Sequence, residues 1–252
     1  MGALSRTFSI PLVAGDVDTA HTDVGGSGDA PEPLEITLHE PALTADNLGL
    51  KTWASSYLLA MRLVLLRHML PTLPADAGVL ELGAGTGLVG LAAAAILQRT
   101  VVLTDLPEIV PNLERNVHAN AAMLAAHSGR AMTAVLDWSE PAIFFVGGQE
   151  QPMHAYPIIL AADCIYSSEH AQLFTNAINH HLARHRDARV VVEVPIREAF
   201  AAERQDFRGR MKALGLAKVG EGEEIGYDDW SDGKDEDELA EVTCWWSIWA
   251  WR

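Results

Sequence analysis

The chain has 252 residues, which fits one large domain, because single hydrophobic cores stop growing near roughly 250–300 residues. A composition of 49% hydrophobic and 21% charged residues excludes a disordered or collagen-like chain. Two cysteines, Cys164 and Cys244, exclude a disulfide framework and a four-cysteine zinc site, and they suit a reducing compartment. The net charge of −16 argues against a nucleic-acid-binding surface, and no apolar stretch is long enough to span a membrane. We therefore expect a soluble cytoplasmic protein, with the nucleus as a second location.

The N-terminal third of the chain predicts a loop, a strand and a helix. Residues 14–33 are small, acidic and rich in glycine and proline, which predicts a mobile loop. Residues 34–39 alternate apolar and polar side chains, a pattern typical of a strand. Residues 52–70 are mostly apolar and lack glycine and proline, so we expect a buried helix with Thr52 as a candidate N-cap.

From residue 78 onward, short apolar runs alternate with helical stretches, a pattern typical of a parallel sheet flanked by helices. The predicted strands cover residues 79–82, 101–103, 132–136, 158–161 and 190–194. The predicted helices cover residues 88–97, a stretch that begins near Pro107 and Pro111, and residues 171–184.

The C-terminal part predicts an interior strand that follows an acidic segment. Residues 242–249 are apolar on both faces and contain no proline, so this strand should lie inside the sheet. Residues 221–241 contain eleven acidic side chains and one lysine. They predict a solvent-exposed hairpin tip between the last two strands, and the alternative is a docking patch for a basic partner.

The strongest motif is the run VLELGAGTGLVG, in which a strand leads into a glycine-rich turn that opens a helix. Gly83 and Gly85 permit a sharp turn and the close approach of a ligand. Doubly wound sheets bind ligands at the carboxyl ends of such strands. The Gly83, Gly85, Gly87 spacing lacks the last glycine of a dinucleotide fingerprint. Glu81 would repel a pyrophosphate but suits a cationic ligand, which favours S-adenosylmethionine over a dinucleotide. The alternative for the motif taken alone is a purely structural turn.

Two further residues follow the next strands. Asp105 ends a strand about 20 residues after the glycines, where an acidic side chain hydrogen-bonds ribose hydroxyls, although an N-cap of the next helix is the alternative. Trp138 closes the strand after that one, and its ring could form a wall for an adenine, whereas an isolated tryptophan is more often part of the core.

The fourth motif is AADCIY, at residues 161–166, which ends the fourth predicted parallel strand. This strand ends at the same edge of the sheet as the glycine turn, so Asp163 and Tyr166 should stand near the reacting group. The alternative for Asp163 is a cap for the helix that begins after it. Cys164 is small and apolar enough to pack there, and we do not interpret it as a nucleophile.

Taken together and in this order, the four motifs resemble those of the seven-β-strand class I methyltransferases. The Asp-x-x-Tyr pattern of Asp163 and Tyr166, and the GLKTW segment that ends at Trp53, are similar to the branch that methylates lysines of non-histone proteins. The resemblance implies an α/β fold, a Rossmann-like, doubly wound, seven-stranded sheet whose last strand is antiparallel. We expect a methyltransferase domain at residues 51–252, preceded by an N-terminal extension at residues 1–50 whose glycine- and acid-rich insert is peculiar to this chain.

The resemblance also implies roles for site residues. The cofactor S-adenosylmethionine, which leaves as S-adenosylhomocysteine, would be held by a set that includes the motif residues Glu81 and Gly87 and the family contacts Trp53, Gly83, Ala84, Gly85, Asp105, Trp138 and the backbone of Ala162. Asp163 and Tyr166 would border the lysine channel, with Asp163 orienting the incoming amine and Tyr166 accepting a hydrogen bond from it.

Other ligand classes are disfavoured. The tightest histidine cluster, His180, His181 and His185, lacks a further ligand at the spacing of zinc proteases, so we expect no metal site. The tryptophans near the C-terminus lie on both faces of a predicted interior strand, which indicates core packing and not a platform for nucleic-acid bases.

We therefore expect an S-adenosylmethionine-dependent protein-lysine N-methyltransferase that acts as a monomer. The acidic surface favours a basic substrate protein, and the specific expectation is a translation elongation factor. Two alternatives remain. The methyl acceptor could be a small-molecule amine, or the chain could be a non-catalytic, cofactor-binding scaffold that recognises a basic partner through residues 221–241.

Overall fold

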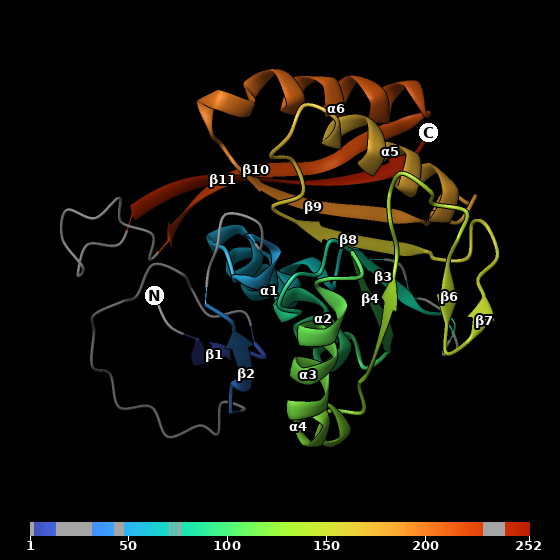
Figure 1. The fold of residues 1–252 in the computed structure, drawn as a ribbon. Helices are drawn as coiled ribbons and strands as arrows, with labels where there is room; N and C mark the ends of the chain where they lie inside the picture. The colour runs from blue at the N-terminus through green and yellow to red at the C-terminus, as the bar shows by residue number, and fades with distance from the viewer. Residues whose placement is uncertain are drawn as a thin grey trace.

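The computed structural model describes residues 3–13, 32–42, 48–70, 72, 74, 77–228 and 240–252. Its central sheet has seven strands: β3 (Val79–Leu82), β4 (Thr100–Asp105), β5 (Arg130–Val135), β8 (Ile158–Ala162), β9 (Arg189–Pro195), β10 (Leu216–Asp228) and β11 (Ala240–Trp251). Their order is β10-β11-β9-β8-β3-β4-β5 (Figure 1). Five neighbouring strands of this sheet run parallel to one another, namely β5, β4, β3, β8 and β9. Strand β11 is antiparallel to both of its neighbours, β9 and β10. The predicted Rossmann-like, seven-stranded α/β sheet is confirmed.

Helices cover both faces of this sheet (Figure 1). One face carries α1 (Ala54–Leu66), α2 (Leu88–Leu97), α3 (Val110–Ala119) and α4 (Ala121–Ala126), and the other carries α5 (His170–His181) and α6 (Ala201–Ala213). The hydrophobic core therefore consists of two clusters, one on each face of the sheet. Leu63 and Leu91 are fully buried in one apolar cluster, and Phe174 and Phe207 are fully buried in the other. No described helix combines the length and apolar character that a membrane crossing requires.

Short elements complete the fold: β6 (Phe145–Val146) and β7 (Gln149–Glu150), and the 3₁₀ turns η1 (Leu48–Leu50) and η2 (Glu198–Phe200). The predicted strands and helices of the central domain are confirmed, with ends that differ by a few residues. The predicted loop at residues 14–33 lies outside the described residues, apart from its last two.

The first predicted helix is shorter than expected. α1 spans Ala54–Leu66 instead of 52–70, and Trp53 precedes it in an extended conformation with φ −93° and ψ 159°. Thr52 does not cap the helix, because its hydroxyl is hydrogen-bonded to the Thr86 hydroxyl at 2.7 Å. The N–H of Ala54 donates instead to Oδ1 of Asp228, 174 residues further along the chain. A carboxylate that is remote in sequence thus accepts a hydrogen bond from a backbone N–H in the first turn of α1, which has no partner within the helix.

The prediction of a hairpin tip at residues 221–241 was partly wrong. Residues 221–228 belong to β10, where they pair with β11, and residues 229–239 lie outside the described part of the chain. β10 is an edge strand, and Glu221 and Glu223 are on its exposed face, where charged side chains are tolerated. Strand alternation places Glu221 and Glu223 in solvent, whereas Glu224 pairs with Arg62 and Asp228 is buried at the start of α1.

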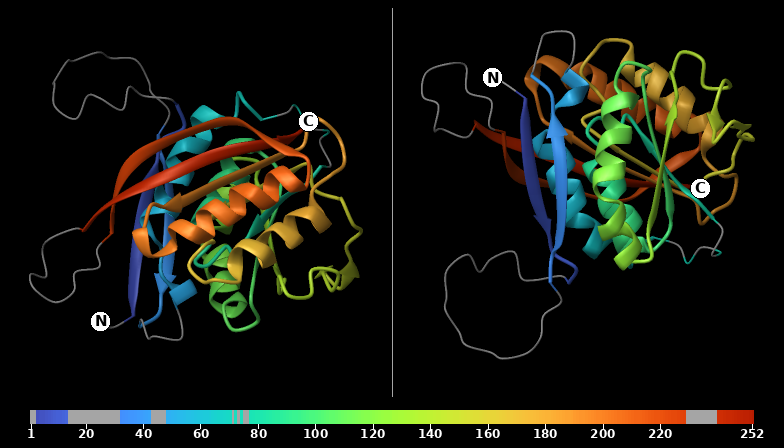
Figure 2. Two further views of the ribbon diagram at one scale, coloured as in Figure 1. Left: turned by 90° about the horizontal axis from the view of Figure 1, so that it is seen from above. Right: turned by 60° about the horizontal axis from the view of Figure 1, so that its bottom comes forward.

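A hairpin of β1 (Leu4–Ile10) and β2 (Leu34–Glu40) lies beside the helices on one face, as Figure 2 shows. The apolar side chains of β2 are fully buried. On the side of β2 away from β1, the Asn120 amide accepts from Thr37 N–H at 3.0 Å and donates to Thr37 C=O at 2.8 Å. Asn116 makes the same pair of bonds to His39, at 2.8 and 3.2 Å. Asn116 of α3 and Asn120, which lies between α3 and α4, thus take the place of a third strand.

Candidate active site

A cavity of about 540 Å³ opens at the carboxyl ends of the parallel strands, within the range of roughly 300–1,000 Å³ for small-molecule sites. Nine of the sequence-predicted site residues line it: Trp53, Gly83, Ala84, Gly85, Asp105, Trp138, Ala162, Asp163 and Tyr166. The topology explains this convergence, because the segments that follow β3, β4, β5 and β8 meet at one edge of the sheet.

Two predicted residues do not line the cavity. Glu81 is within β3, where it is buried, and burial raises the pKa of its carboxyl well above the usual value. Gly87 precedes α2 with φ +94°, and a Cβ there would stand 2.7 Å from the Leu113 side chain. Gly87 is therefore required by the entry into the helix, and Glu81 packs beneath the glycine turn near Gly90.

Asp105 braces the glycine turn. Its Oδ2 accepts from the N–H of Gly85 at 2.7 Å, and its Oδ1 accepts from the N–H of Leu106 at 2.8 Å. α3 begins only at Val110, so Asp105 is not its N-cap. Burial raises the pKa of Asp105 to about 6, although the two backbone bonds partly oppose the shift. Each carboxylate oxygen keeps a second acceptor position, which can take a hydroxyl group from a ligand in the cavity.

Gly85 has to be a glycine for two reasons. Its φ of +57° is in the left-handed region, and a Cβ built on it would stand 2.8 Å from the carbonyl oxygen of Gly49. The glycine turn therefore packs directly against the chain segment before α1. This contact brings Lys51 and Trp53 to the same cavity, and Nζ of Lys51 lies 4.9 Å from the Trp53 ring centroid.

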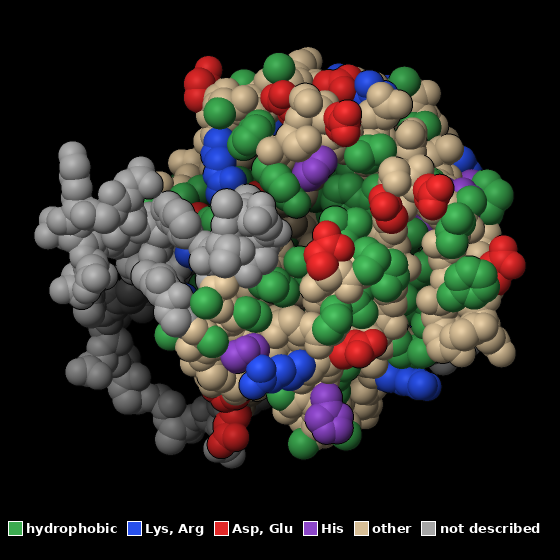
Figure 3. Space-filling view, viewed as in Figure 1, with side chains coloured by type: hydrophobic (Ala, Val, Ile, Leu, Met, Phe, Trp, Pro, Cys, Tyr) green, Lys and Arg blue, Asp and Glu red, His purple; other side chains and the backbone are tan. Residues whose placement is uncertain are grey.

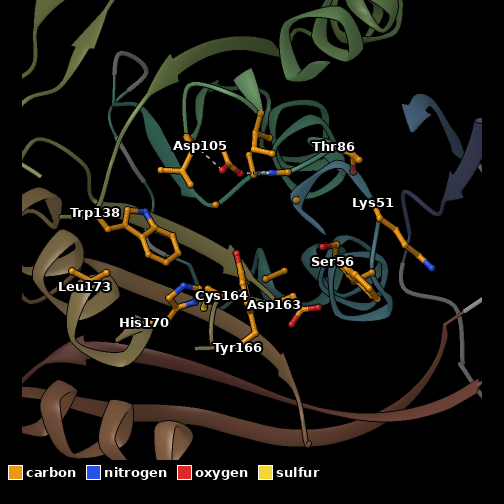
Figure 4. Close-up of a pocket in the computed structure, with 18 of the residues that line it drawn as sticks. Lys51, Ser56, Thr86, Asp105, Trp138, Asp163, Cys164, Tyr166, His170 and Leu173 are labelled. Carbon is orange, nitrogen blue, oxygen red and sulfur yellow. Dashed lines mark hydrogen bonds between the residues drawn. The ribbon is translucent and has the colours of Figure 1, made fainter. Parts of the chain in front are cut away.

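Aromatic rings form one wall of the cavity, shown in Figure 4. The Trp138 ring packs against Phe174, with centroids 5.3 Å apart, and meets the edge of His170 at 6.0 Å. Tyr166 lies edge-on to His170 at 4.3 Å and is 43% exposed. Burial lowers the pKa of His170 and raises the pKa of Tyr166 to about 12, so both side chains are neutral at pH 7. The rings of this wall are uncharged and apolar, which suits contact with an aromatic ligand.

Asp163 ends β8 in a conformation that is uncommon for a residue with a side chain. Its φ is +48°, and its N–H donates to the carbonyl of Glu193 at 2.9 Å. The side chain is buried, and its Oδ1 has no hydrogen-bond partner among the described residues. α5 begins at His170, so Asp163 does not cap it. A strained residue with an unpaired buried oxygen at a cavity indicates a functional role.

The sequence analysis missed two residues that surround Asp163. Nη2 of Arg197, from the loop after β9, lies 3.7 Å from Oδ2 of Asp163 and 3.9 Å from Oδ2 of Asp228. Burial raises the pKa of Asp163 to about 6, whereas Arg197 lowers this pKa and Asp228 raises it. Arg197 follows a strand end, which is a signal that could have identified it. Asp228 was one of eleven acidic residues in a run, and no local pattern distinguished it.

No group of three or more His, Cys, Asp or Glu side chains within the described ranges is arranged to hold a metal ion. The free thiol of Cys164 is buried beside Asp163, and burial raises its pKa well above the usual value, so it stays a protonated packing group. The side chains that line the cavity include carboxylates, a guanidinium group and aromatic rings.

Comparisons with known proteins agree with this geometry. A family model described as "Lysine methyltransferase" matches residues 32–212. The protein-lysine N-methyltransferase rrg1 of Schizosaccharomyces pombe is 36% identical over 222 residues, which cover 87% of this chain and 68% of that protein. The protein-lysine N-methyltransferase EFM2 of Saccharomyces cerevisiae is 38% identical over 213 residues, covering 77% of this chain and 48% of EFM2. The chain thus spans about two thirds of one relative and about half of the other.

Two further matches are more limited. EEF1A lysine methyltransferase 3 of Mus musculus is 35% identical over 102 residues, covering 40% of this chain and 39% of that protein. The solved structure of a candidate RNA methyltransferase from Pyrococcus horikoshii has a TM-score of 0.51 at 15% identity, and covers 77% of this chain and 82% of its own. At this identity the likeness is one of fold alone.

Proposed function

The chain belongs to the lysine methyltransferase family, as its motifs predicted, and from this premise we propose how its cavity methylates a protein lysine. S-adenosylmethionine, when bound, supplies a methyl group on a positively charged sulfur. The donor set of the cavity fits this cofactor. Asp105 has free acceptor positions for ribose hydroxyls, the aromatic wall at Trp138 suits an adenine, and the carboxylates suit a cation.

Asp163 receives the incoming amine. A lysine ammonium has no lone pair and a usual pKa of about 10.4, so it must lose a proton before it can accept a methyl group. A partly dry channel lowers that pKa, because burial disfavours the charged form. Water accepts that proton, and the resulting amine donates an N–H to the carboxylate of Asp163, which orients the lone pair of the nitrogen for transfer. Asp163 is thus an orienting acceptor and need not be an obligate base.

Tyr166 borders the same channel. Its hydroxyl stays protonated at pH 7, because its pKa is raised to about 12, and a neutral hydroxyl can accept the second N–H of the amine. His170 holds the Tyr166 ring edge-on at 4.3 Å. The side chains of Asp163 and Tyr166 therefore fix two of the three directions around the nitrogen.

The observation that carries this proposal is that the buried Asp163 lines the cavity while one of its carboxylate oxygens has no hydrogen-bond partner among the described residues. We expect Asp163→Asn to slow methyl transfer by about 10²–10³-fold, as the loss of one aligned electrostatic partner does in other sites. Tyr166→Phe should slow it less. Single-turnover rates measure the transfer, and calorimetric titration with S-adenosylmethionine measures cofactor affinity. A loss of affinity equal to the loss of rate would contradict the assignment.

The substrate we propose is translation elongation factor 1A, modified by this chain as a monomer in the cytoplasm. Support comes from the mouse relative, whose name gives EEF1A as its substrate, and from a net charge of −16, which favours a basic partner. Incubation with radioactive S-adenosylmethionine should label a lysine of recombinant elongation factor 1A. Label found only on small amines would favour the small-molecule alternative, and binding of cofactor without any transfer would favour the scaffold. Light scattering and cell fractionation test the oligomeric state and location.

A further inference from the structure

A second hollow of about 260 Å³ adjoins the catalytic cavity. Residues 6–9 of β1 form one wall, and Tyr227 and Asp228 at the end of β10 form the other. The start of α1, including Tyr57, lies between these walls, and Trp53 lines both the hollow and the cavity. We call this hollow the β1–β10 groove.

Both walls of the groove are edge strands. In the described part of the chain, β1 pairs only with β2, and β10 pairs only with β11. An edge strand presents unpaired N–H and C=O groups along one side, and an extended peptide can add to them as a further strand. The far edge of β2 is occupied by Asn116 and Asn120, so among the described residues the β1 edge, and not the β2 edge, is the one that an incoming strand can use.

The side chains in the groove suit a polypeptide and not a small polar ligand. The rings of Phe8 and Tyr57 are 6.0 Å apart, and Tyr227 is 59% exposed beside them. Tyrosine and phenylalanine are enriched where proteins bind other proteins, since a ring gives apolar contact and the hydroxyl finds a hydrogen bond. A bound polypeptide would cover the ring of Tyr227, which is largely exposed on an edge strand in the absence of a partner.

The groove and the cavity meet at Arg197. Asp228 lines the groove, Asp163 lines the cavity, and the same nitrogen of Arg197 lies within 3.9 Å of one and 3.7 Å of the other. The groove therefore borders the cavity close to the carboxylate that we propose receives the lysine.

We propose that the β1–β10 groove binds the substrate protein as an extended segment, which adds to the edge of β1 and passes its lysine beside Trp53 to Asp163. This inference rests on the proposed function. Figure 3 shows acidic, basic and hydrophobic side chains interspersed on one face of the molecule. The groove itself contains one side chain of each sign, Arg6 and Asp228. The substrate protein is the occupant we propose because the groove adjoins the cavity that receives its lysine, and Trp53 lines both.

Two groove variants and two matched controls test the proposal. Ser9→Arg fills the groove with a cation, whereas Ser5→Arg places the same side chain on β1 outside it. Tyr227→Ala removes the exposed ring, whereas Ile225→Ala truncates an equally exposed neighbour on the same strand. We expect the groove variants to raise KM for the protein substrate about tenfold and the controls to leave it unchanged. All four should keep the wild-type affinity for S-adenosylmethionine, which also shows that they fold.

The substrate in this experiment is recombinant elongation factor 1A or, in its place, the protein that the wild-type enzyme labels in a cell extract. Hydrogen exchange of the β1 amides should slow when this protein is added, because strand addition protects them. Equal KM values for groove and control variants, or unchanged exchange in β1, would overturn the inference while the proposed function stands. If the wild-type enzyme labels no protein at all, the proposed function fails, and the groove proposal fails with it.

Discussion

Nη2 of Arg197 lies 3.7 Å from Oδ2 of Asp163, so the carboxylate that ends β8 faces a cation from the loop after the neighbouring strand. Asp228 stands on the other side of the same guanidinium group at 3.9 Å. Because the pKa of Asp163 is raised to about 6, its ionisation near neutral pH depends on both charged neighbours.

Substitutions of these neighbours should shift the pH dependence of methyl transfer in opposite directions. Arg197→Ala removes the charge that lowers the pKa of Asp163, so the acid limb of the rate should move up by about one pH unit. Asp228→Asn removes the charge that raises it, while a side-chain oxygen remains for the Ala54 N–H, so the limb should move down. Single-turnover rates against pH measure both shifts. Arg186→Ala, on an exposed side chain, is the control, and shifts of the same sign in both variants would contradict the interpretation.

Asp105 makes cofactor affinity depend on pH. The ionised carboxylate accepts hydroxyl groups, and its pKa is about 6, so affinity should be complete above that pH and fall as the pH drops through it. Asp105→Ala should weaken binding by roughly 1.5–3 kcal/mol, or about ten- to a hundredfold. Calorimetric titration with S-adenosylhomocysteine at several pH values measures this, with Asp187→Ala as the surface control. An affinity independent of pH would count against a ribose-binding carboxylate.

Two glycine substitutions should have opposite effects on stability. In Gly85→Ala the new Cβ would stand 2.8 Å from the carbonyl oxygen of Gly49, and the alanine would have to adopt a left-handed conformation. We therefore expect the free energy of unfolding to fall by about 1–3 kcal/mol and cofactor binding to be lost. Gly209→Ala, in the interior of α6, meets nothing within 4 Å and should gain roughly 0.5–1 kcal/mol. Urea unfolding followed by circular dichroism measures both. A stable Gly85→Ala variant that still binds cofactor would refute the close packing of the turn.

Asn116 should be essential for the attachment of the β1–β2 hairpin. Its amide bonds to both backbone groups of His39 and also donates to the carbonyl of Thr86 at 2.9 Å. Asn116→Leu leaves buried polar groups unpaired and should cost about 1–3 kcal/mol. Hydrogen exchange at the His39 amide should accelerate more than exchange in β3. Asn179→Leu, at a position outside this contact, is the control, and equal acceleration in both strands would indicate a global effect instead.

Much of the site was readable from the chain, because its residues act at the ends of their own strands. Gly83 and Gly85 had to be glycines in any strand-to-helix turn of this kind. Asp163 follows an apolar run directly, and Asp105 follows one after a single threonine. Because the carboxyl ends of parallel strands lie at the same edge of a sheet, such positions come together in the folded chain. The same reasoning wrongly added Glu81 and Gly87 to the residues that line the cavity, because they belong to the same motif. The Glu81 side chain is buried within the sheet, and Gly87 precedes the first residue of α2.

The partners of these residues depended on segments that only the folded chain brings together. Asp228 reaches the start of α1 across 174 residues, and Asn120 bonds to Thr37 across 83. Neither contact has a local signal, because a side chain in an acidic run or on an amphipathic helix looks the same whether it meets solvent or a distant backbone group. Strand order decides such contacts: β11 inserts between β9 and β10, and this places the end of β10 beside α1 and Arg197. Local chemistry is thus encoded locally, whereas the charge on Asp163 is adjusted by residues whose proximity follows from sheet topology.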